Sequence, residues 1–596
     1  MVKDILQNLE SEISNWLKQA GIDTPVVFLE RAVDPEFGEY STNVGMKYAK
    51  ELSMSPLLLA EDLVTFLADK NPYGVEKIEF VKPGFINFYL TNEAKIEHLE
   101  TIINAQNKYG QNTLRVGESW VIEHTSPNPN KAMHLGHLRN NLVGMSIVRL
   151  LKNAGAEVAS DAVYNNRGIS IAKNMYGYLA HMKKNPEAPT DVEYWSTHKD
   201  EWFTPEEKNQ RPDLFVTECY VLGEKDFANT EIEKQVRQLV VDWEAGDTKV
   251  RELWALVLQF AYDGINLTLN RVGNHWDKIW YEHEHYQEGK DYVGKGLNEG
   301  KFTKLEDGAI ISNLEADYGL SDTVLLKKDG TSLYITQDIA LTDLKKKTYQ
   351  ADKLVWVVGP DQTLALRQLF AVCEQLGIGK VADFTHVTYG YVGLRDESGA
   401  YKKMSSREGT VVLADDVLDK VKATVKARFD EEGKHDESKR EELAEKLALA
   451  AVKFAFLKSD STQDVSFDVN QSVDVQGDSG MYVMYTYVRT RSILKKAGAP
   501  GNSQPAVEVS LGEEASLVRT LLYFEDVVAK SVDDLSVHHV SQYLLQLCSE
   551  FNSWYAKESI LDGSSREAYK LTVVEAVSIT IRNGLALLGI ETIKEM

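Results

Sequence analysis

The stretch "SWVIEHTSPNPNKAMHLGHLRNNLVGMSIVRLLKNAG", residues 119–155, decides the fold expected for the centre of this chain. It begins with a short apolar run typical of a strand and passes through a turn with two prolines. Leu138, Leu142 and Met145 then recur at helical spacing, and Gly155 favours a helix end before the next apolar run, 157–165. Strand, turn, helix and strand in this order predict a parallel crossover. Ligands bind such sheets at the carboxyl ends of the strands, where this turn lies.

The turn ends in two histidines, His134 and His137, at the expected helix start. A helix N-terminus presents unpaired backbone N–H groups that attract anions, and histidines there can donate hydrogen bonds to phosphate oxygens. Gly136 between them lets a backbone or an adenine ring approach closely, and Lys131 can add a point charge. A lone histidine at such a place is more often a packing residue. The pair, after a proline-rich turn in this unit, favours a phosphate-binding role.

Length and composition indicate a multidomain protein of the soluble class. The chain has 596 residues, 43% hydrophobic and 26% charged, and no apolar run long enough to span a membrane. We therefore expect no membrane partner and a cytoplasmic location. Its three cysteines lie far apart, which excludes a disulfide framework and a cysteine-based zinc site, so no intrinsic metal is expected.

The net charge of −24 argues against indiscriminate nucleic-acid binding, and we expect no DNA partner. A selective RNA enzyme remains compatible with this charge if lysine and arginine gather on one face. The basic stretches 344–350 and 420–428 are candidates for such a face, although solvated helix surfaces are the more ordinary interpretation of each.

The pattern along the chain predicts an α/β multidomain protein. Residues 1–110 alternate helical and strand patterns and form an N-terminal α+β domain. Residues 111–415 form a Rossmann-type, doubly wound catalytic domain with a helical insertion at about 172–300, and further strands are expected at 322–328, 332–340, 353–360 and 386–394. Residues 416–474 form a helical linker, and residues 475–596 form a C-terminal all-α helix bundle.

A second motif lies downstream in "AYKKMSSREGTVV", residues 400–412. Lys403, Met404, Ser405 and Ser406 belong to a polar loop with charge enough to fold over a triphosphate. Alone it would be an ordinary basic loop. With the histidine pair in this order, it resembles the HIGH and KMSKS signatures of class I aminoacyl-tRNA synthetases.

Further segments resemble the arginyl-tRNA synthetases over nearly the whole chain: "SPNPNK" (126–131), "DGTSLYITQDIALTDLK" (329–345), "GMYVMYTYVRTRSILKKAG" (480–498) and "NGLALLGIETIKEM" (583–596). The resemblance implies activation of L-arginine with ATP and Mg²⁺ and transfer of the arginyl group to tRNA(Arg). It also implies that tRNA is needed for the first step. Lys131, His134, Gly136, His137 and Lys403 to Ser406 would then serve ATP. The family pattern has a second lysine where Ser406 stands, and Lys131 would replace it, sharing the triphosphate with Lys403.

The same resemblance implies an arginine pocket. Glu123 and Asn128 would contact the amino acid, Tyr334 and Asp338 would hold its guanidinium, and Gln362 would assist. A guanidinium is a planar, permanently charged fork, so its pocket needs carboxylate acceptors in fixed geometry and a flat face. Without the resemblance, Asp338 would be a helix-end charge and Tyr334 a half-buried core residue.

Contacts with tRNA are implied in both end domains. Phe85 and Asn87 would meet a D-loop base, whereas Tyr482, Tyr485, Tyr555 and Met596 would lie on the anticodon side. A tryptophan that some members have four residues after the position of Tyr555 is Ser559 here, so the resemblance does not extend to that contact. Two alternatives stay open: a class I synthetase for another amino acid, such as a cysteinyl or glutaminyl enzyme, and a catalytically silent RNA-binding relative. A monomer is expected.

Overall fold

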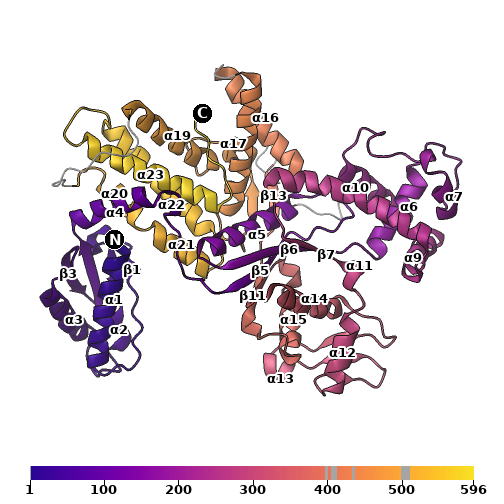
Figure 1. Cartoon of the computed structure of the whole chain (residues 1–596), viewed down its shortest axis with the longest axis horizontal. Coiled ribbons are helices and arrows are strands. Elements are labelled where there is room, and N and C mark those ends of the chain that lie inside the picture. The colour runs from indigo at the N-terminus through magenta and orange to yellow at the C-terminus, as the bar shows by residue number, and fades with distance from the viewer. Residues whose placement is uncertain (1, 396–400, 404–411, 433–435, 499–510, 596) are drawn as a thin grey trace.

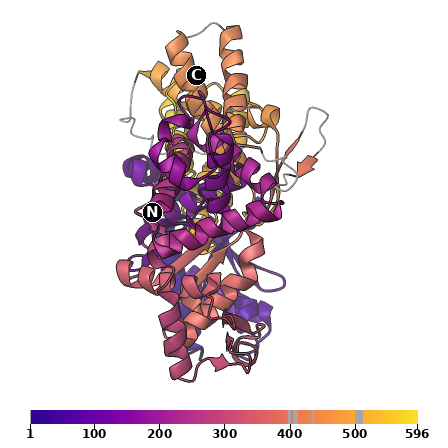
Figure 2. The ribbon, with the colours of Figure 1, turned by 90° about the vertical axis from the view of Figure 1, so that its right-hand side faces the viewer.

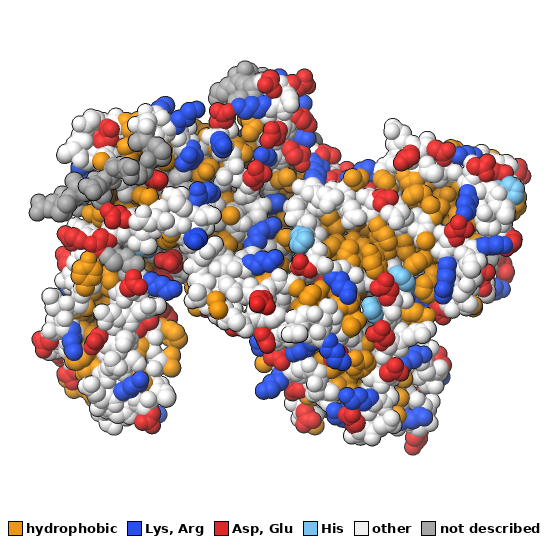
Figure 3. Space-filling view, viewed as in Figure 1, with side chains coloured by type: hydrophobic (Ala, Val, Ile, Leu, Met, Phe, Trp, Pro, Cys, Tyr) orange, Lys and Arg blue, Asp and Glu red, His pale blue; other side chains and the backbone are white. Residues whose placement is uncertain are grey.

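The computed structural model describes residues 2–395, 401–403, 412–432, 436–498 and 511–595, with the backbone alone at 395, 401–403 and 430–432. Its four parts are an N-terminal module, a central sheet domain, a group of inserted helices and a C-terminal bundle (Figure 1). A hollow separates the N-terminal module from the lower lobe of the central domain (Figure 3). Among the described residues, no helix has the length and apolar character of a membrane span.

The N-terminal module packs helices on an antiparallel sheet. Helix α1 (Val2–Gln19) buries Ile5, Leu9 and Ile13 at helical spacing, as its sequence predicts. The sheet has the order β1 (Glu30–Arg31), β2 (Tyr40–Thr42), β4 (Phe85–Leu90) and β3 (Val75–Val81). Helices α2 (Val44–Tyr48) and α3 (Pro56–Lys70) complete it, and α4 (Asn92–Ala105) with η2 (Gln106–Lys108) leads into the next domain.

The central domain is a parallel five-stranded sheet. Its order is β12 (Phe384–Val387), β11 (Lys353–Val357), β5 (Ser119–Glu123), β6 (Glu157–Tyr164) and β7 (Lys278–Tyr281). Trp120 and Ile122 of β5 enter the core that includes α5 (Leu135–Asn153), whereas Val121 packs on the other face, in the core of α14 (Tyr334–Tyr349) and α15 (Thr363–Gln375). This doubly wound architecture confirms the predicted Rossmann-type fold.

The structure departs from the sequence prediction at several elements of this domain. Strand β7 lies inside the range given to the insertion and returns to the sheet. Residues 332–340 were expected to form a strand, which is wrong, because the helix α14 begins at Tyr334. The β-branched run there resembles a strand, yet Thr336, Ile339 and Ala340 are buried at helical spacing. Strand β10 (Thr323–Leu326) belongs to a separate antiparallel sheet with β9 (Ile310–Ser312) and β8 (Thr303–Lys304). The run 386–394 divides between β12 and β13 (Val392–Arg395).

The inserted helices form a compact unit beside the sheet (Figure 1). They are α6 (Ile169–His181), α7 (Val192–Thr197), α8 (Pro212–Asp226), α9 (Thr230–Ala245) and α10 (Thr248–Val272). Helices α6 and α8 approach closely, because a Cβ added at Gly177 would lie 1.9 Å from the Cys219 carbonyl oxygen. Trp195, Trp202 and Phe215 fill their separate core.

The rest of the chain is mainly helical. Helices α16 (Ala414–Glu432) and α17 (Glu437–Leu457) project side by side beyond the molecule (Figure 2). Strands β14 (Tyr401–Lys403), β13 and β15 (Val465–Phe467) form a small sheet, followed by the short α18 (Val469–Ser472). The bundle contains α19 (Gly480–Ala497), α20 (Ala515–Leu522), α21 (Phe524–Asp533), α22 (His538–Lys557) and α23 (Glu567–Leu587), and confirms the predicted all-α end domain.

Candidate active site

The histidine turn lies at the switch point of the sheet, where the chain leaves β5 and β11 toward opposite sides. Asn140 of α5 joins the two strand ends, because its Nδ2 donates to the Val357 carbonyl at 2.8 Å and its Oδ1 accepts from the Thr125 N–H at 2.7 Å. Thr125 has a positive φ of 71°, which is rare for a β-branched residue. The turn is therefore held in a strained shape at the place where ligands of this fold bind.

His134 and His137 cap the helix and stack on each other. Nδ1 of His134 accepts from the Gly136 N–H at 3.1 Å and the His137 N–H at 3.4 Å, and Nδ1 of His137 accepts from the His134 N–H at 3.3 Å. The two rings lie 3.8 Å apart between centroids with an angle of 16°. A Cβ at Gly136 would lie 3.0 Å from the His134 ring, so glycine leaves room for this arrangement.

This geometry fixes the chemical form of both rings. Burial, with Lys131 nearby, lowers the pKa of His134 to about 4, and burial with His134 lowers the pKa of His137 well below its ordinary value. Both histidines are thus neutral at pH 7. Because each Nδ1 accepts a hydrogen bond, the proton resides on Nε2. The pair offers two neutral Nε2–H donors, suited to phosphate oxygens.

A buried ion cluster lies beneath this turn. Lys345 Nζ donates to Glu123 Oε2 and to Asp161 Oδ1, each at 2.8 Å. Burial opposes the charge on Lys345, but the two carboxylates raise its pKa above the ordinary value. Asp161 Oδ2 also accepts from Trp280 Nε1 at 2.7 Å. Burial raises the pKa of Asp161, whereas Lys345 opposes this shift. The cluster holds Glu123 at the end of β5.

Sequence analysis did not identify Lys345 and Asp161 as functional residues. Lys345 belongs to the basic stretch 344–350, for which we considered RNA contacts or a solvated face, but its side chain is 1% exposed. Asp161 is the partner of Glu123 on the neighbouring strand β6. The rule that sites gather at strand ends could have indicated Asp161; no local signal distinguishes Lys345 from its lysine neighbours.

Tyr334 and Asp338 lie one turn apart on α14, and not on the strand expected at 332–340. Asp338 remains open to the site, yet the surrounding protein removes solvent from its carboxylate, and with the charge of Glu123 this raises its pKa to about 7. Glu282, at the end of β7, adds to this effect. Glu282 was missed because β7 was assigned to the insertion. Several acids therefore face one site, which suits a cationic ligand.

A large open cavity of about 1180 Å³ adjoins these acids. Tyr334, 76% exposed, lines it together with Glu282 and Gln337. Asn128 lies on the β5 side of the site, where its Oδ1 accepts from Asn165 Nδ2 at 3.3 Å. Gln362 is exposed in η4 (Pro360–Gln362), and its side chain makes no hydrogen bond to any described residue.

The lysine loop is tied to the histidine turn at its far end. Lys403 ends β14, where only its backbone is described, and Met404, Ser405 and Ser406 lie outside the described residues. After them, His134 pairs with Leu413, the Leu135 N–H donates to the Val412 carbonyl at 3.2 Å, and the Ala414 N–H donates to the Met133 carbonyl at 3.0 Å. Burial lowers the pKa of Lys131 beside these histidines.

Arg139 fastens α5 to the hairpin that carries Lys403. It is fully buried, and among the described residues its partners are backbone carbonyls, at 2.8 Å for Gly390, 3.0 Å for Ser461 and 2.5 Å for Gln463. Burial lowers the pKa of Arg139 to about 10, so it stays charged at neutral pH. The histidine helix, the entry to β13 and the end of α17 are thereby joined.

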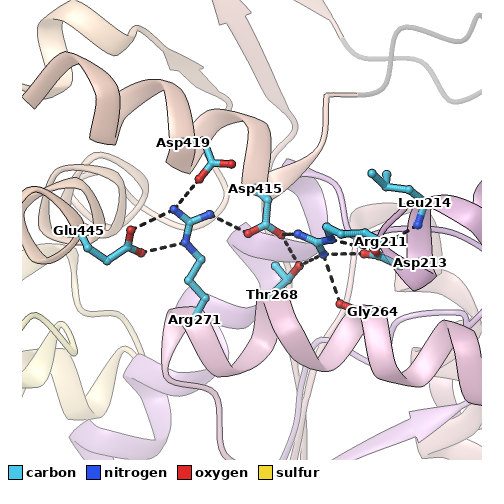
Figure 4. Close-up of polar contacts among 9 residues, drawn as sticks. All are labelled: Arg211, Asp213, Leu214, Gly264, Thr268, Arg271, Asp415, Asp419 and Glu445. Carbon is cyan, nitrogen blue, oxygen red and sulfur yellow. Dashed lines mark hydrogen bonds and ion pairs between the residues drawn. The ribbon is translucent and has the colours of Figure 1, made fainter. Parts of the chain in front are cut away.

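An ion network holds the first turn of α16, immediately after the lysine loop (Figure 4). The Asp415 carboxylate forms ion pairs with Arg271 and Arg211, each at 2.8 Å. Arg271 lies in the last turn of α10, and Arg211 immediately precedes α8. Arg271 also contacts Asp419 at 2.7 Å and Glu445 at 2.8 Å. The insertion, α16 and α17 therefore meet at one point beside the site.

The predicted RNA-contact residues lie far from this site. Phe85 is exposed on β4, but Asn87 is 2% exposed, with an Nδ2 that has no hydrogen-bond partner among the described residues. A base can reach Phe85 in this conformation and cannot reach Asn87. Met596 lies outside the described residues.

The bundle presents a flat platform that includes two of the predicted tyrosines. Tyr485 and Tyr555, each 40% exposed, flank the Arg489 guanidinium at 4.8 and 5.1 Å from their ring centroids. Tyr482 is half-buried, and its hydroxyl accepts from Asn552 Nδ2 at 3.2 Å. Arg489 was missed, although it stands one turn after Tyr485. Stacked planar groups of this kind suit unpaired bases.

No cluster of three or more His, Cys, Asp or Glu side chains placed to hold a metal occurs among the described residues. The free cysteines 219, 373 and 548 are buried. The site is therefore built from hydrogen-bond donors, acids and a strained turn.

Three family models together match most of the chain. Residues 98–170 and 196–469 match "tRNA synthetases class I (R), catalytic domain". Residues 483–596 match "DALR anticodon binding domain", and residues 7–90 match "Arginyl tRNA synthetase N terminal domain".

Individual proteins agree with these models. The arginine–tRNA ligase of Porphyromonas gingivalis is 33% identical, over 99% of this chain and 100% of its own length. That of Bacteroides fragilis is also 33% identical, over 98% of each. The structure of the Thermus thermophilus arginyl-tRNA synthetase has a TM-score of 0.80 at 25% identity, covering 99% of this chain and 100% of that one. A Plasmodium falciparum arginyl-tRNA synthetase shares the fold, with a TM-score of 0.77 at 18% identity and 99% of both chains covered.

Proposed function

Because the chain belongs to the arginyl-tRNA synthetase family of class I enzymes, we propose how its own residues perform the reaction of an arginine–tRNA ligase. The enzyme activates L-arginine with ATP and transfers it to tRNA(Arg). We assign these roles mainly from the stacked pair of neutral histidines, His134 and His137, at the switch point of the sheet. The acids Glu123, Asp338 and Glu282 lie close to one another, Glu123 and Glu282 at strand ends of the same sheet.

In the first step, a carboxylate oxygen of arginine attacks the α-phosphorus of ATP, and the bond to the β-phosphate oxygen breaks. The products are arginyl-adenylate and diphosphate. The Nε2–H groups of His134 and His137 donate to the phosphate oxygens as charge develops on them. Preorganised donors of this kind act by positioning and by electrostatics. Lys131 and Lys403 neutralise the triphosphate, and Met404, Ser405 and Ser406 belong to the same loop.

Arginine is held by the acids around Asp338. Asp338 pairs with the guanidinium, Tyr334 supplies a flat face, and Gln362 assists at the neighbouring strand end. Glu123, oriented by Lys345, and Asn128 contact the amino-acid end. A lysine substrate would present one ammonium in place of the planar fork and would leave an acceptor unpaired.

In the second step, a terminal ribose hydroxyl of tRNA(Arg) attacks the arginyl carbonyl carbon, and AMP leaves. We propose that residues 1–110 contact the tRNA elbow through Phe85, that 111–415 carry out the chemistry and that 416–474 contact the stem. Residues 475–596 bind the anticodon through Tyr482, Tyr485, Tyr555 and Met596. Asn87, expected beside Phe85 in the elbow contact, is buried and takes no part in it. Mg²⁺ enters with ATP, because this ion prefers phosphate and water ligands. We further propose a cytoplasmic monomer with no DNA or membrane partner.

ATP–pyrophosphate exchange with purified enzyme tests this function. Exchange is expected with arginine in the presence of tRNA(Arg), and not with lysine or citrulline. Binding of tRNA without exchange for any amino acid would instead indicate a silent RNA-binding relative. Exchange with another amino acid would indicate a different class I specificity.

The histidine roles have a sharper test. His134→Asn keeps a side-chain oxygen that can accept the helix-capping N–H groups but removes the Nε2–H, so kcat should fall about 10²- to 10³-fold at unchanged stability. Full activity in this variant would refute the role.

A further inference from the structure

A second candidate site lies where three parts of the chain meet, near the opposite end of α5 from His134. A recess of about 450 Å³ is lined by the segment around Tyr109, the last turn of α5, Phe524 of α21 and the end of α23. Its cations are Arg149, Lys152 and Arg582, and none of the described residues that line it is a carboxylate. In a chain with a net charge of −24, this is an unusual local excess of positive charge.

Arg582 has a donor without a partner. Its Nε donates to Asn583 Oδ1 at 3.3 Å, whereas its buried Nη2 has no hydrogen-bond partner among the described residues. A buried guanidinium donor left unsatisfied is costly, so it points to an acceptor that arrives from outside the chain.

Arg149 is likewise uncompensated. Its guanidinium lies against Gly589, where an added Cβ would stand 2.4 Å from Arg149 Cζ. Lys453 reaches the same residue, donating to the Gly589 carbonyl at 2.8 Å. Arg149 has no ion pair with any described residue, and burial lowers its pKa. Glu591, whose charge acts on Lys453, is held by Lys446 at 3.0 Å. Burial and the charge of Arg149 lower the pKa of Lys453 to about 8, although the charge of Glu591 opposes this shift.

The walls of the recess are fixed by hydrogen bonds. Asn583 Nδ2 donates to the carbonyls of Gln106 at 2.7 Å and Tyr109 at 2.9 Å, and Asn153 Nδ2 donates to the Gly110 carbonyl at 2.7 Å. The cations therefore stand on a preformed frame, which lowers the cost of ordering a ligand.

We propose that this junction recess binds a phosphate group, with Arg149, Arg582 and Lys152 as its ligands, and that the phosphate belongs to the backbone of bound tRNA. The inference rests on the proposed function for the source of the phosphate. Helix α5 has 19 residues, so the recess lies roughly 28 Å from His134. That separation suits a long polyanion that must also reach the bundle, part of which lines the recess.

The test uses the full chain and the double variant Lys152→Met/Arg582→Met, which leaves Arg149 on Gly589 in place. The dissociation constant of tRNA(Arg) is measured against salt concentration. Loss of two phosphate contacts should raise the Kd about tenfold and reduce the slope of log Kd against log salt by about one to two. Lys234→Met/Arg237→Met on α9 removes the same charge from exposed ion pairs and should change neither quantity.

A second arm separates the sources of phosphate and does not depend on catalysis. Thermal stabilisation by inorganic phosphate is measured with ATP and arginine at saturation, so that the active site is occupied. An unchanged tRNA slope with loss of this stabilisation in the double variant would assign the recess to free phosphate. If neither the slope nor the stabilisation changes, the proposal is overturned. Because tRNA binding is measured directly, a failure of arginine activation would count against the proposed function alone.

Discussion

Asp338 is a carboxylate that can pair with a guanidinium only when it is ionised. Its raised pKa of about 7 means that, in the free enzyme, the charged form is lost as pH falls through 7. We expect kcat/KM for arginine to fall about tenfold per pH unit below that value, whereas kcat stays flat because the bound guanidinium restores ionisation. Steady-state kinetics between about pH 5 and 9 measure this. Asp338→Asn should give a low, flat profile, and a flat wild-type profile down to pH 5 would contradict the assignment.

Replacing Lys345 should affect both the stability of the protein and the binding of arginine. Lys345→Met leaves Glu123 and Asp161 without their cation, which should lower the free energy of unfolding by about 3–5 kcal/mol and raise KM for arginine. Urea unfolding measures the first effect. Adding Asp161→Asn should restore part of the stability.

Lys347→Met is the matched control, because Lys347 is exposed and its one ion-pair partner among the described residues, Asp343, lies on the same helix. Its effect should stay below about 0.5 kcal/mol. Equal losses in the two variants would refute the role of the buried cluster.

These residues also show what the sequence could and could not predict. The spacing of His134 and His137 in the turn predicted a phosphate site, since the local pattern and its place after a strand carry that signal. Lys345 was hidden in a run of three lysines, because burial comes from the packing of α14 on distant strands. Asn87 follows exposed Phe85 by two residues and so shares its face of β4, yet only the folded sheet shows that Asn87 is buried.

At the level of elements, the parallel unit around α5 was predictable and the later strands were not. The expected strand at 332–340 is the start of α14 because tertiary burial outweighs the strand preference of its β-branched residues. Strand β7 has only four residues and follows the long helix α10, so its pattern was too short to detect. Because β7 was not predicted, Glu282 at its carboxyl end was not predicted as a site residue either.

The first turn of α16 depends on Arg271 of α10. Arg271→Met removes contacts to Asp415, Asp419 and Glu445, so the first turn of α16 should lose its fixed position beside the site. We expect kcat for arginine activation to fall about tenfold with little change in KM, and stability to fall by about 2–3 kcal/mol. Pyrophosphate exchange and urea unfolding measure the two effects.

Asp419→Asn is the control, because this acid is 66% exposed at the edge of the network and should matter by less than about 0.5 kcal/mol. A normal kcat in Arg271→Met would show that the network serves stability alone.

At the scale of the whole molecule, the N-terminal module packs against the C-terminal bundle. One hydrophobic core runs from the N-terminal module through α5 to the bundle. Polar contacts reinforce it: the Tyr109 hydroxyl donates to the Leu521 carbonyl at 2.9 Å, and the Tyr523 hydroxyl donates to the Glu39 carbonyl at 3.1 Å. The order of the domains was predictable from local patterns. Their junctions were not, because each contact joins residues more than 400 positions apart.

Arg519 is the polar centre of this junction. Its Nη2 donates to the Gly38 carbonyl at 2.6 Å and its Nε donates to the Tyr523 hydroxyl at 2.8 Å. Arg519→Met should loosen the N-terminal module, so that Phe85 is no longer held at a fixed distance from the bundle. The proposed elbow contact then loses effective concentration, and KM for tRNA should rise about three- to tenfold while KM for arginine and ATP stays unchanged. Lys530→Met, an exposed change on the neighbouring helix, should leave all three values unchanged. An unaltered KM for tRNA in Arg519→Met would show that the N-terminal module does not contribute to tRNA binding through this junction. A rise in KM for arginine as well would show that the junction also stabilises the catalytic domain.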